Sequence, residues 1–110
     1  MENCIFCKIA GGEIPAEKIY EDKATIAFPD IHPKVAGHTL LIPKTHHQWF
    51  QDMPDAESDA LFRAAKKVAQ KLKKDYKADY IRVGIVGTDV PHVHVHVFPQ
   101  KIADKNPIIV

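Results

Sequence analysis

A short run of alternating histidines and valines constrains this chain more than any other part of its sequence. Residues 91–99 read Pro-His-Val-His-Val-His-Val-Phe-Pro. Successive side chains of a β-strand point to opposite faces, so His92, His94 and His96 would share one face and the valines the other. The valine face suits a buried core, whereas three neighbouring imidazoles need polar surroundings. The pattern predicts a strand over His92–Phe98 with one structural and one chemical face.

Two kinds of chemistry fit a row of imidazoles on one face. Imidazoles can ligate zinc and leave a position open for water, as hydrolytic zinc sites do. Alternatively, one neutral imidazole can attack phosphorus while its neighbours hold the phosphate oxygens. A third interpretation is a histidine stripe without function, which the strict alternation between two prolines disfavours.

The remaining sequence predicts an α+β domain. Apolar residues recur at helical spacing within Pro54–Tyr76, which predicts one long helix; they are Leu61, Ala65, Val68, Leu72 and Tyr76. Because the βαβ alternation of parallel sheets is missing, we expect a five-stranded antiparallel sheet. The other expected elements are a short helix over Cys4–Ala10 and strands over Lys18–Glu21, Ala24–Phe28, His38–Ile42 and Tyr80–Val86.

Length and charge narrow the class of protein. A chain of 110 residues is expected to form one domain, residues 1–110. Its 15 Lys and Arg against 14 Asp and Glu leave a net charge of +1, which argues against binding nucleic acid by bulk electrostatics. No apolar run reaches the roughly 18 residues of a membrane span, and the first residues show no signal-peptide pattern. We therefore expect a cytoplasmic protein that does not bind membranes.

The two cysteines of the chain, Cys4 and Cys7, form a Cys-x-x-Cys motif. In a reducing cytosol this spacing favours metal binding or redox chemistry over a structural disulfide. Two reduced cysteines without a metal are the alternative, because the motif alone is a weak signal.

The histidine run and its flanking motifs together resemble the histidine triad family of nucleotide hydrolases and transferases. The family signature alternates histidine with hydrophobic residues, as His92–Phe98 does. Further similar segments lie upstream: Cys4–Ile9, Ile14–Pro15, Tyr20–Asp22, Ala27–Ile31 and Gly37–His46. The resemblance as a whole extends over essentially the whole chain. The resemblance implies an α+β fold of one five-stranded antiparallel sheet, one long helix and a short N-terminal helix. It also implies a homodimer in which two sheets pair.

The resemblance assigns roles to single residues. His94 would be the nucleophile that forms a covalent nucleotidyl intermediate at the α-phosphate, and His96 and His38 would hold the phosphate and the leaving group. Asp30 would accept hydrogen bonds from the ribose hydroxyls, and Ile31 would contact the base or sugar. The expected nucleotide-binding set is Asp30, Ile31, Asp89, His94 and His96. Without the resemblance, Asp30 also fits a turn-forming aspartate and His38 a strand-end histidine.

Some members of the family hold zinc, and the matching residues here are Cys4, Cys7, His46 and His92. Two thiolates and two imidazoles make a tetrahedral site of the structural kind. We therefore expect one structural zinc ion per chain and no organic cofactor. His47, next to His46, is a competing ligand, and His32 has no expected role.

The loop before the histidine run departs from the family pattern. Many members have a longer loop, with an asparagine and then Gly-Gln followed by Ser or Thr, where this chain has Gly84–Pro91. Asp89 stands roughly where that hydroxyl would be. The missing groups would contact phosphate and leaving group, so the loop bears on substrate choice and turnover.

The resemblance thus implies a hydrolase or transferase whose partner is a purine nucleotide or nucleoside phosphoramidate. It would cleave a nucleoside 5′-phosphoramidate, an aminoacyl adenylate or a dinucleoside polyphosphate at the α-phosphate. Two alternatives stay open. One is a nucleotide sensor with little turnover, and the other is a zinc hydrolase that uses His92, His94 and His96 as metal ligands.

Overall fold

The computed structural model describes residues 3–104 and has an α+β fold. In chain order its elements are α1 (Ile5–Ala10), β1 (Tyr20–Glu21), β2 (Thr25–Pro29), β3 (Thr39–Pro43), the 3-10 helix η1 (Phe50–Asp52), α2 (Asp55–Asp75), β4 (Tyr80–Ile85) and β5 (Val95–Gln100). The expected order of helices and strands is confirmed, and η1 is an addition that the sequence pattern did not predict.

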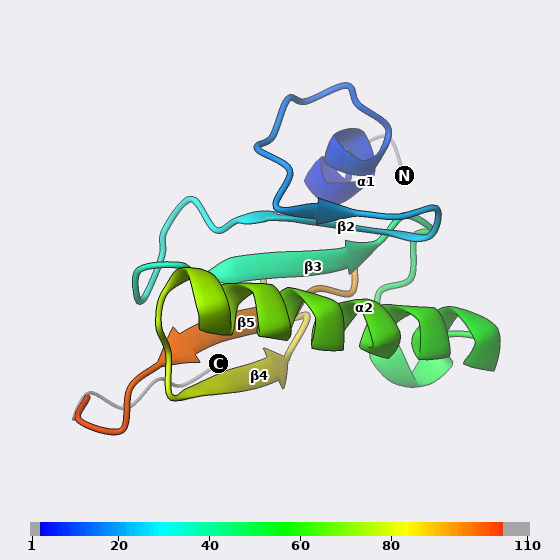
Figure 1. Cartoon of the computed structure of the whole chain (residues 1–110). Coiled ribbons are helices and arrows are strands. Elements are labelled where there is room, and N and C mark those ends of the chain that lie inside the picture. The colour runs from blue at the N-terminus through cyan, green and yellow to red at the C-terminus, as the bar shows by residue number, and fades with distance from the viewer. Residues whose placement is uncertain (1–2, 105–110) are drawn as a thin grey trace.

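The five strands form one antiparallel sheet in the order β1-β2-β3-β5-β4 (Figure 1). In its register, Leu40 of β3 lies opposite both Phe28 of β2 and His96 of β5. Residues directly opposite each other point to the same face of a sheet, so His96 shares a face with these two apolar residues. The neighbouring row, which contains Leu41 and Val95, points to the other face.

The long helix α2 covers the face that carries the valines (Figure 1). Five buried residues of α2 share one core cluster with Val93, Val95 and Val97: Leu61, Ala64, Ala65, Val68 and Leu72. Acidic residues in the first turn and lysines in the last turn suit the helix dipole. The expected fifth member of the stripe was wrong: Tyr76 follows the last helical residue and is 45% exposed. Within residues 3–104, no helix combines the length and apolar character needed to cross a membrane.

The short helix α1 packs on the opposite face of the sheet. Cys4 is its N-cap, and the Cys4 thiol accepts a hydrogen bond from the Cys7 backbone N–H at 3.4 Å. Phe6 is buried with Phe28 and Leu40 in a second apolar cluster on this face. The helix therefore lies where its side chains reach the row of histidines.

The predicted bounds of the histidine strand were wrong. β5 begins at Val95, so His92 and His94 lie before it, and it continues through Pro99 to Gln100. The early part is held by other bonds, because the Val93 N–H donates to the His47 carbonyl oxygen at 2.7 Å. Proline is tolerated at position 99 because β3 begins opposite Val97. No residue of β3 therefore lies opposite Pro99 to accept a hydrogen bond from a backbone N–H there. The alternation itself is confirmed, since all three valines are buried in the core beneath α2.

Candidate active site and metal cluster

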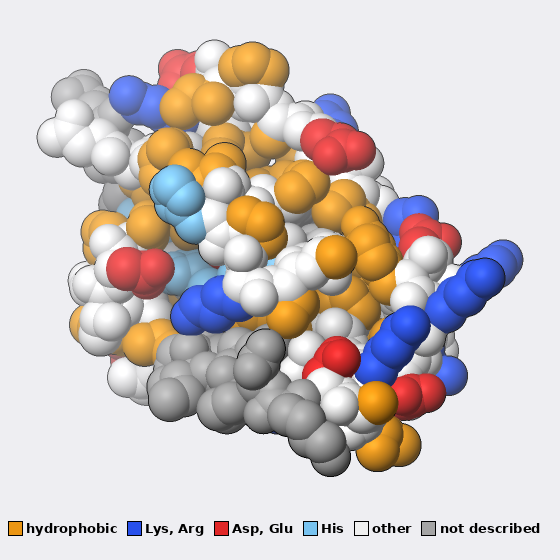
Figure 2. Space-filling model, turned by 90° about the vertical axis from the view of Figure 1, so that its left-hand side faces the viewer, with side chains coloured by type: hydrophobic (Ala, Val, Ile, Leu, Met, Phe, Trp, Pro, Cys, Tyr) orange, Lys and Arg blue, Asp and Glu red, His pale blue; other side chains and the backbone are white. Residues whose placement is uncertain are grey.

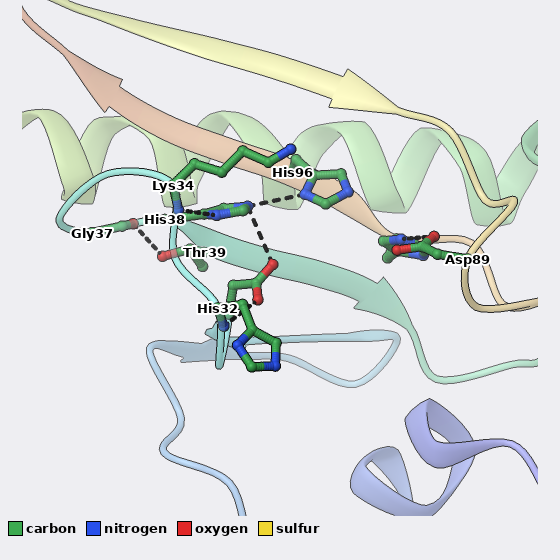
Figure 3. Close-up of polar contacts among 9 residues, drawn as sticks. His32, Lys34, Gly37, His38, Thr39, Asp89 and His96 are labelled. Atoms are coloured by element: carbon green, nitrogen blue, oxygen red, sulfur yellow. Dashed lines mark hydrogen bonds and ion pairs between the residues drawn. The ribbon is translucent and has the colours of Figure 1, made fainter. Parts of the chain in front are cut away.

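Two chain segments bring the site together at one side of the sheet. His38 immediately precedes β3, and the loop that leads to it begins at Asp30, just after β2. Gly37 turns this loop with φ of 88°, and a Cβ there would lie 2.7 Å from Pro99 Cγ and 2.9 Å from the Tyr76 ring. Glycine is therefore required, because a side chain would strain the backbone and collide with both rings. The turn delivers His38 against His96 of β5 (Figure 3).

A hydrogen-bonded chain fixes the ring protons of His38 and His96. The backbone N–H of Lys34 donates to His38 Nδ1 at 3.2 Å, so the ring proton of neutral His38 is on Nε2. That Nε2 lies 2.9 Å from His96 Nδ1 and 3.4 Å from Asp30 Oδ2. Because His96 Nδ1 then accepts, we assign the His96 proton to Nε2, where it is a donor for a bound group.

His94 is anchored by the backbone of its own segment. Its Nδ1 donates to the His92 carbonyl oxygen at 2.8 Å, which leaves Nε2 as an unprotonated nitrogen. Among the described residues, one buried side-chain nitrogen or oxygen has no hydrogen-bond partner, and it is this Nε2. An unsatisfied buried nitrogen is costly, and its lone pair is available to attack an electrophile.

Asp89 lies beside this nitrogen, with Oδ1 3.2 Å from His94 Nε2. The distance does not make a hydrogen bond when the imidazole is neutral, because neither atom then has a proton to share. The side chain of Asp89 is 67% exposed, whereas that of His94 is 1% exposed. Asp89 therefore lies at the open rim and His94 beneath it.

Burial keeps the two supporting histidines uncharged. Desolvation, followed by the nearby His94 and His38, lowers the pKa of His96 to about 4. Desolvation also lowers the pKa of His38, partly opposed by the Asp30 carboxylate and helped by the Lys34 cation. Both rings are thus neutral at pH 7, which agrees with the tautomers assigned from their partners.

An apolar pocket of about 500 Å³ opens beside these histidines. Its apolar walls come from α1, from the strands β2 and β3, and from the loop between β4 and β5: Ile5, Phe6, Ile9, Phe28, Leu40 and Val90. Asp30, Ile31, Asp89, His94 and His96 all line the same pocket. From the side on which the β2–β3 loop lies, histidine side chains emerge among hydrophobic ones (Figure 2). The volume and lining suit a small organic ligand with a polar end at the histidines.

The four expected zinc ligands form one cluster. The ligand atoms of Cys4, Cys7, His46 and His92 all lie within 4.8 Å of one another. His92 Nδ1 is 3.3 Å from Cys4 Sγ and 3.5 Å from Cys7 Sγ, and His46 Nδ1 is 3.2 Å from Cys7 Sγ. Tetrahedral zinc, with bonds of about 2.0–2.3 Å, separates neighbouring ligand atoms by roughly 3.3–3.8 Å, so the cluster fits zinc with little movement.

The protonation pattern of the cluster also suits a metal. His92 Nε2 donates to the Pro43 carbonyl oxygen at 2.8 Å, which leaves Nδ1 as the free ligand nitrogen. Burial lowers the pKa of His92 and of His46, so both are neutral imidazoles. Burial and the neighbouring Cys4 raise the pKa of Cys7 to about 11, so without a bound cation the thiol keeps its proton at neutral pH. A metal ion would stabilise the thiolate, and the proton would then be released to solvent.

Not every histidine joins these groups. His47, the competing ligand, instead lies with Nε2 3.2 Å from Glu57 Oε2, and the exposed His32 contributes its backbone N–H to Asp30 Oδ1 at 2.8 Å. His92 Nδ1 faces the cysteines, so the three run histidines do not converge on one metal position as the zinc-hydrolase alternative requires. Sequence reasoning missed Lys34, whose side chain extends toward His96 in Figure 3. It had no signal for Lys34, because the position of this side chain depends on the path of the loop.

Comparison with known proteins identifies the family. The HIT domain matches residues 11–102, which is most of the chain. This chain belongs to the HIT family. It is 44% identical over 105 residues to an uncharacterised HIT-like protein of Methanocaldococcus jannaschii, covering 92% of this chain and 81% of the relative. It is 40% identical over 108 residues to an adenosine 5′-monophosphoramidase of Saccharomyces cerevisiae, covering 97% of this chain and 68% of that enzyme.

A solved structure supports the same assignment. A zinc-bound histidine triad family protein of Mycobacterium smegmatis superposes with a TM-score of 0.87 at 34% identity, covering 94% of this chain and 79% of that one. The resemblance deduced from the histidine run is thus confirmed, together with the fold that it implied.

We predict that His96 titrates far below free histidine. Its folded pKa of about 4 lies below the ordinary 6.5, so the unfolded chain binds the proton first as the pH falls. The contribution of His96 to stability is therefore complete above pH 6.5 and is lost between pH 6.5 and 4. NMR of the histidine ring nitrogens should give the low pKa and a proton on Nε2.

Denaturant unfolding across this pH range provides the second measurement. His96→Gln should lose stability less steeply than the wild type as the pH falls, while His32→Gln, at an exposed site, should follow the wild type. A His96 pKa near 6.5 would contradict the desolvated, neutral His96 ring that we assign beside His38.

Proposed function

We propose that this protein is a nucleotidyl hydrolase that cleaves nucleoside 5′-monophosphate derivatives at the α-phosphate through a covalent intermediate on His94. The observation that carries the proposal is the buried, unpartnered His94 Nε2, whose ring is anchored through Nδ1 and which lines an apolar pocket. The candidate substrates are nucleoside 5′-phosphoramidates, aminoacyl adenylates and dinucleoside polyphosphates. The purine preference is supported by the similarity to the yeast adenosine 5′-monophosphoramidase.

In the first step, His94 Nε2 attacks the α-phosphorus. A bond forms between Nε2 and phosphorus while the bond from phosphorus to the leaving nitrogen or oxygen breaks, and the leaving atom takes one proton from water at the rim. The ring becomes cationic because Nδ1 keeps its proton, and the hydrogen bond from Nδ1 to the His92 carbonyl stabilises that charge.

In the second step, water attacks the phosphorus of the adduct. The bond from phosphorus to Nε2 breaks, the nucleoside monophosphate leaves, and water gives up the proton that balances the first step. The adduct is a phosphoramidate, which hydrolyses readily, so one difficult displacement becomes two easier ones.

The other site residues would bind and orient the nucleotide. His96 would donate its Nε2–H to a phosphate oxygen, and His38 would hold the His96 ring through the 2.9 Å contact. In the apolar pocket, the base or sugar would lie against Ile31. The remaining lone pairs of the Asp30 carboxylate oxygens would accept hydrogen bonds from the ribose hydroxyls. Asp89, at the rim, completes the proposed nucleotide-binding set.

The cytoplasmic location stays a prediction.

We predict that His94→Ala abolishes turnover and leaves nucleoside monophosphate binding largely intact. Removal of the nucleophile should lower kcat on the order of 10³-fold or more, because no other lone pair occupies its position. His96→Ala and His38→Ala should slow turnover less, and His32→Ala should match the wild type.

Mass spectrometry of wild-type protein mixed with an adenylated amine should show an adduct of nucleotidyl mass on His94. Equal activity of His94→Ala and wild type would overturn the mechanism. Nucleotide binding without turnover or adduct in the wild type would favour the sensor alternative.

We also propose that Cys4, Cys7, His46 and His92 hold one structural zinc ion per chain. The support is the donor set, the 3.2–3.5 Å contacts and the Pro43 carbonyl that orients His92. Zinc there would tie α1 to the segment that positions His94, and no reaction step needs it.

We predict one zinc per chain in protein purified without a metal-binding tag. Chelator or mild acid should remove it and lower the melting temperature, because protons compete for thiolates and imidazoles. His46→Ala should lose zinc, whereas His47→Ala is the matched control and should keep it. Metal-free protein that does not respond to chelator would contradict the site.

We further infer a homodimer that forms through β4. This strand is an edge of the sheet and exposes Tyr80 and Val83, and an exposed apolar edge favours pairing with a second copy. Light scattering at micromolar concentration should give twice the chain mass of 12.4 kDa, and Val83→Lys should shift it toward monomer. A wild-type monomer under these conditions would be the contrary result.

A further inference from the structure

Asp89 places a carboxylate in contact with the atom that we propose as the nucleophile. Oδ1 lies 3.2 Å from His94 Nε2, on the loop that joins β4 and β5. A carboxylate at this place is unexpected for a protein that binds phosphate esters, because it repels the phosphate. The position therefore calls for an explanation other than binding of the phosphate itself.

The Asp89 carboxylate is ionised at neutral pH. Burial opposes its ionisation, but the Val90 backbone N–H and the nearby His94 and His96 together hold the pKa of Asp89 below its ordinary value. Opposite the carboxylate is the lone pair of His94 Nε2, which has no hydrogen-bond partner among the described residues. Two electron-rich groups that face each other are stabilised by a positively charged or proton-donating group bound near both.

The geometry of attack keeps Asp89 beside the reacting centre. Phosphorus must come within about 3–3.5 Å of the attacking nitrogen, which is the distance at which Oδ1 already lies. The carboxylate must therefore turn aside when substrate binds, and its 67% exposed side chain can do so without loss of packing. A side chain of two rotatable bonds cannot carry it far, so the negative charge stays next to the substituents of the phosphorus.

Charged groups are distributed unequally around the histidines. Lys34 is close enough to His38 to lower its pKa, and its side chain extends toward His96 (Figure 3). Asp30 is paired with His38 on that same side, and Glu17 lines a part of the pocket formed with Pro15 and Ala16. The phosphate oxygens thus find donors on the His96 side. In an in-line displacement the leaving group departs on the side of phosphorus away from the buried His94, which is toward the open rim where the exposed Asp89 lies.

We propose that Asp89 is a specificity-determining residue that favours substrates whose leaving group carries positive charge and disfavours anionic leaving groups. The preferred class is a nucleoside 5′-phosphoramidate of an amine that bears a second, cationic group, and the disfavoured class includes nucleoside polyphosphates. This inference rests on the proposed function and specifies its substrate.

The test compares three adenosine 5′-phosphoramidates of similar size, made from 1,3-diaminopropane, n-butylamine and β-alanine. Their leaving groups are cationic, neutral and anionic. In the wild type, kcat/KM for the diamine should exceed that for β-alanine by about tenfold or more, as expected for one charge a few ångströms from the reacting centre. Asp89→Asn keeps the size and an acceptor oxygen, and it should reduce this ratio to within about twofold.

The matched control is Glu17→Gln, which removes an acidic group from the same pocket but not from His94. It should keep the wild-type ratio. If the wild type hydrolyses the butylamine compound but Asp89→Asn leaves the ratio unchanged, the role of Asp89 is wrong and the proposed function stands. If the wild type releases no adenosine monophosphate from any of the three but does so from a dinucleoside polyphosphate, this inference is wrong and the proposed function stands. If it hydrolyses neither these compounds nor an aminoacyl adenylate or dinucleoside polyphosphate, the proposed function fails and this inference fails with it.

Discussion

The site depends on one hydrogen bond within a three-residue segment, from His94 Nδ1 to the His92 carbonyl oxygen at 2.8 Å. In a regular central strand, backbone carbonyls bond to a neighbouring strand. Here β5 begins only at Val95, so the His92 carbonyl is free to accept from a side chain. The late start of β5 is therefore what fixes the tautomer of His94 and leaves its Nε2 lone pair facing the pocket. If β5 began a few residues earlier, the His92 carbonyl would bond to a neighbouring strand. It would then no longer accept the hydrogen bond that orients the His94 ring.

His92 connects this anchor to the metal cluster by using each of its polar groups differently. Its carbonyl orients His94, its Nε2 donates to Pro43 at the end of β3, and its Nδ1 faces the two cysteines. Any group held at that cluster also holds the backbone that positions His94, the proposed nucleophile. A structural metal site in this protein would thus affect catalysis through geometry alone, without contact with the reacting atoms.

The sequence was sufficient for the parts of this structure that depend on local periodicity. Alternation of His and Val predicts the two faces of the segment, and helical spacing predicts α2 with Leu61 and Val68 in the core. The contacts that decide the chemistry come from elsewhere. The contact between Lys34 and His38 depends on the Gly37 turn, and the register of β3 and β5 brings His38 to His96. The true start of β5 could not be predicted, because it depends on a bond from Val93 to His47 in a distant loop.

The neutrality of the buried histidines explains why charge is found at the rim of the pocket. Protonated imidazoles in contact would repel one another, and burial removes this conflict between His38 and His96 by lowering the pKa of His96 to about 4 and that of His38 below its usual value. A neutral imidazole still donates one directional hydrogen bond, so it can position a phosphate, but it supplies no net charge to attract or discriminate ligands. In the proposed function, discrimination by charge would then be left to exposed residues such as Lys34 and Asp89, whose side chains can adjust while the buried histidines stay fixed. The buried part of the site would set the reaction, and the exposed part would set which substrates can undergo it.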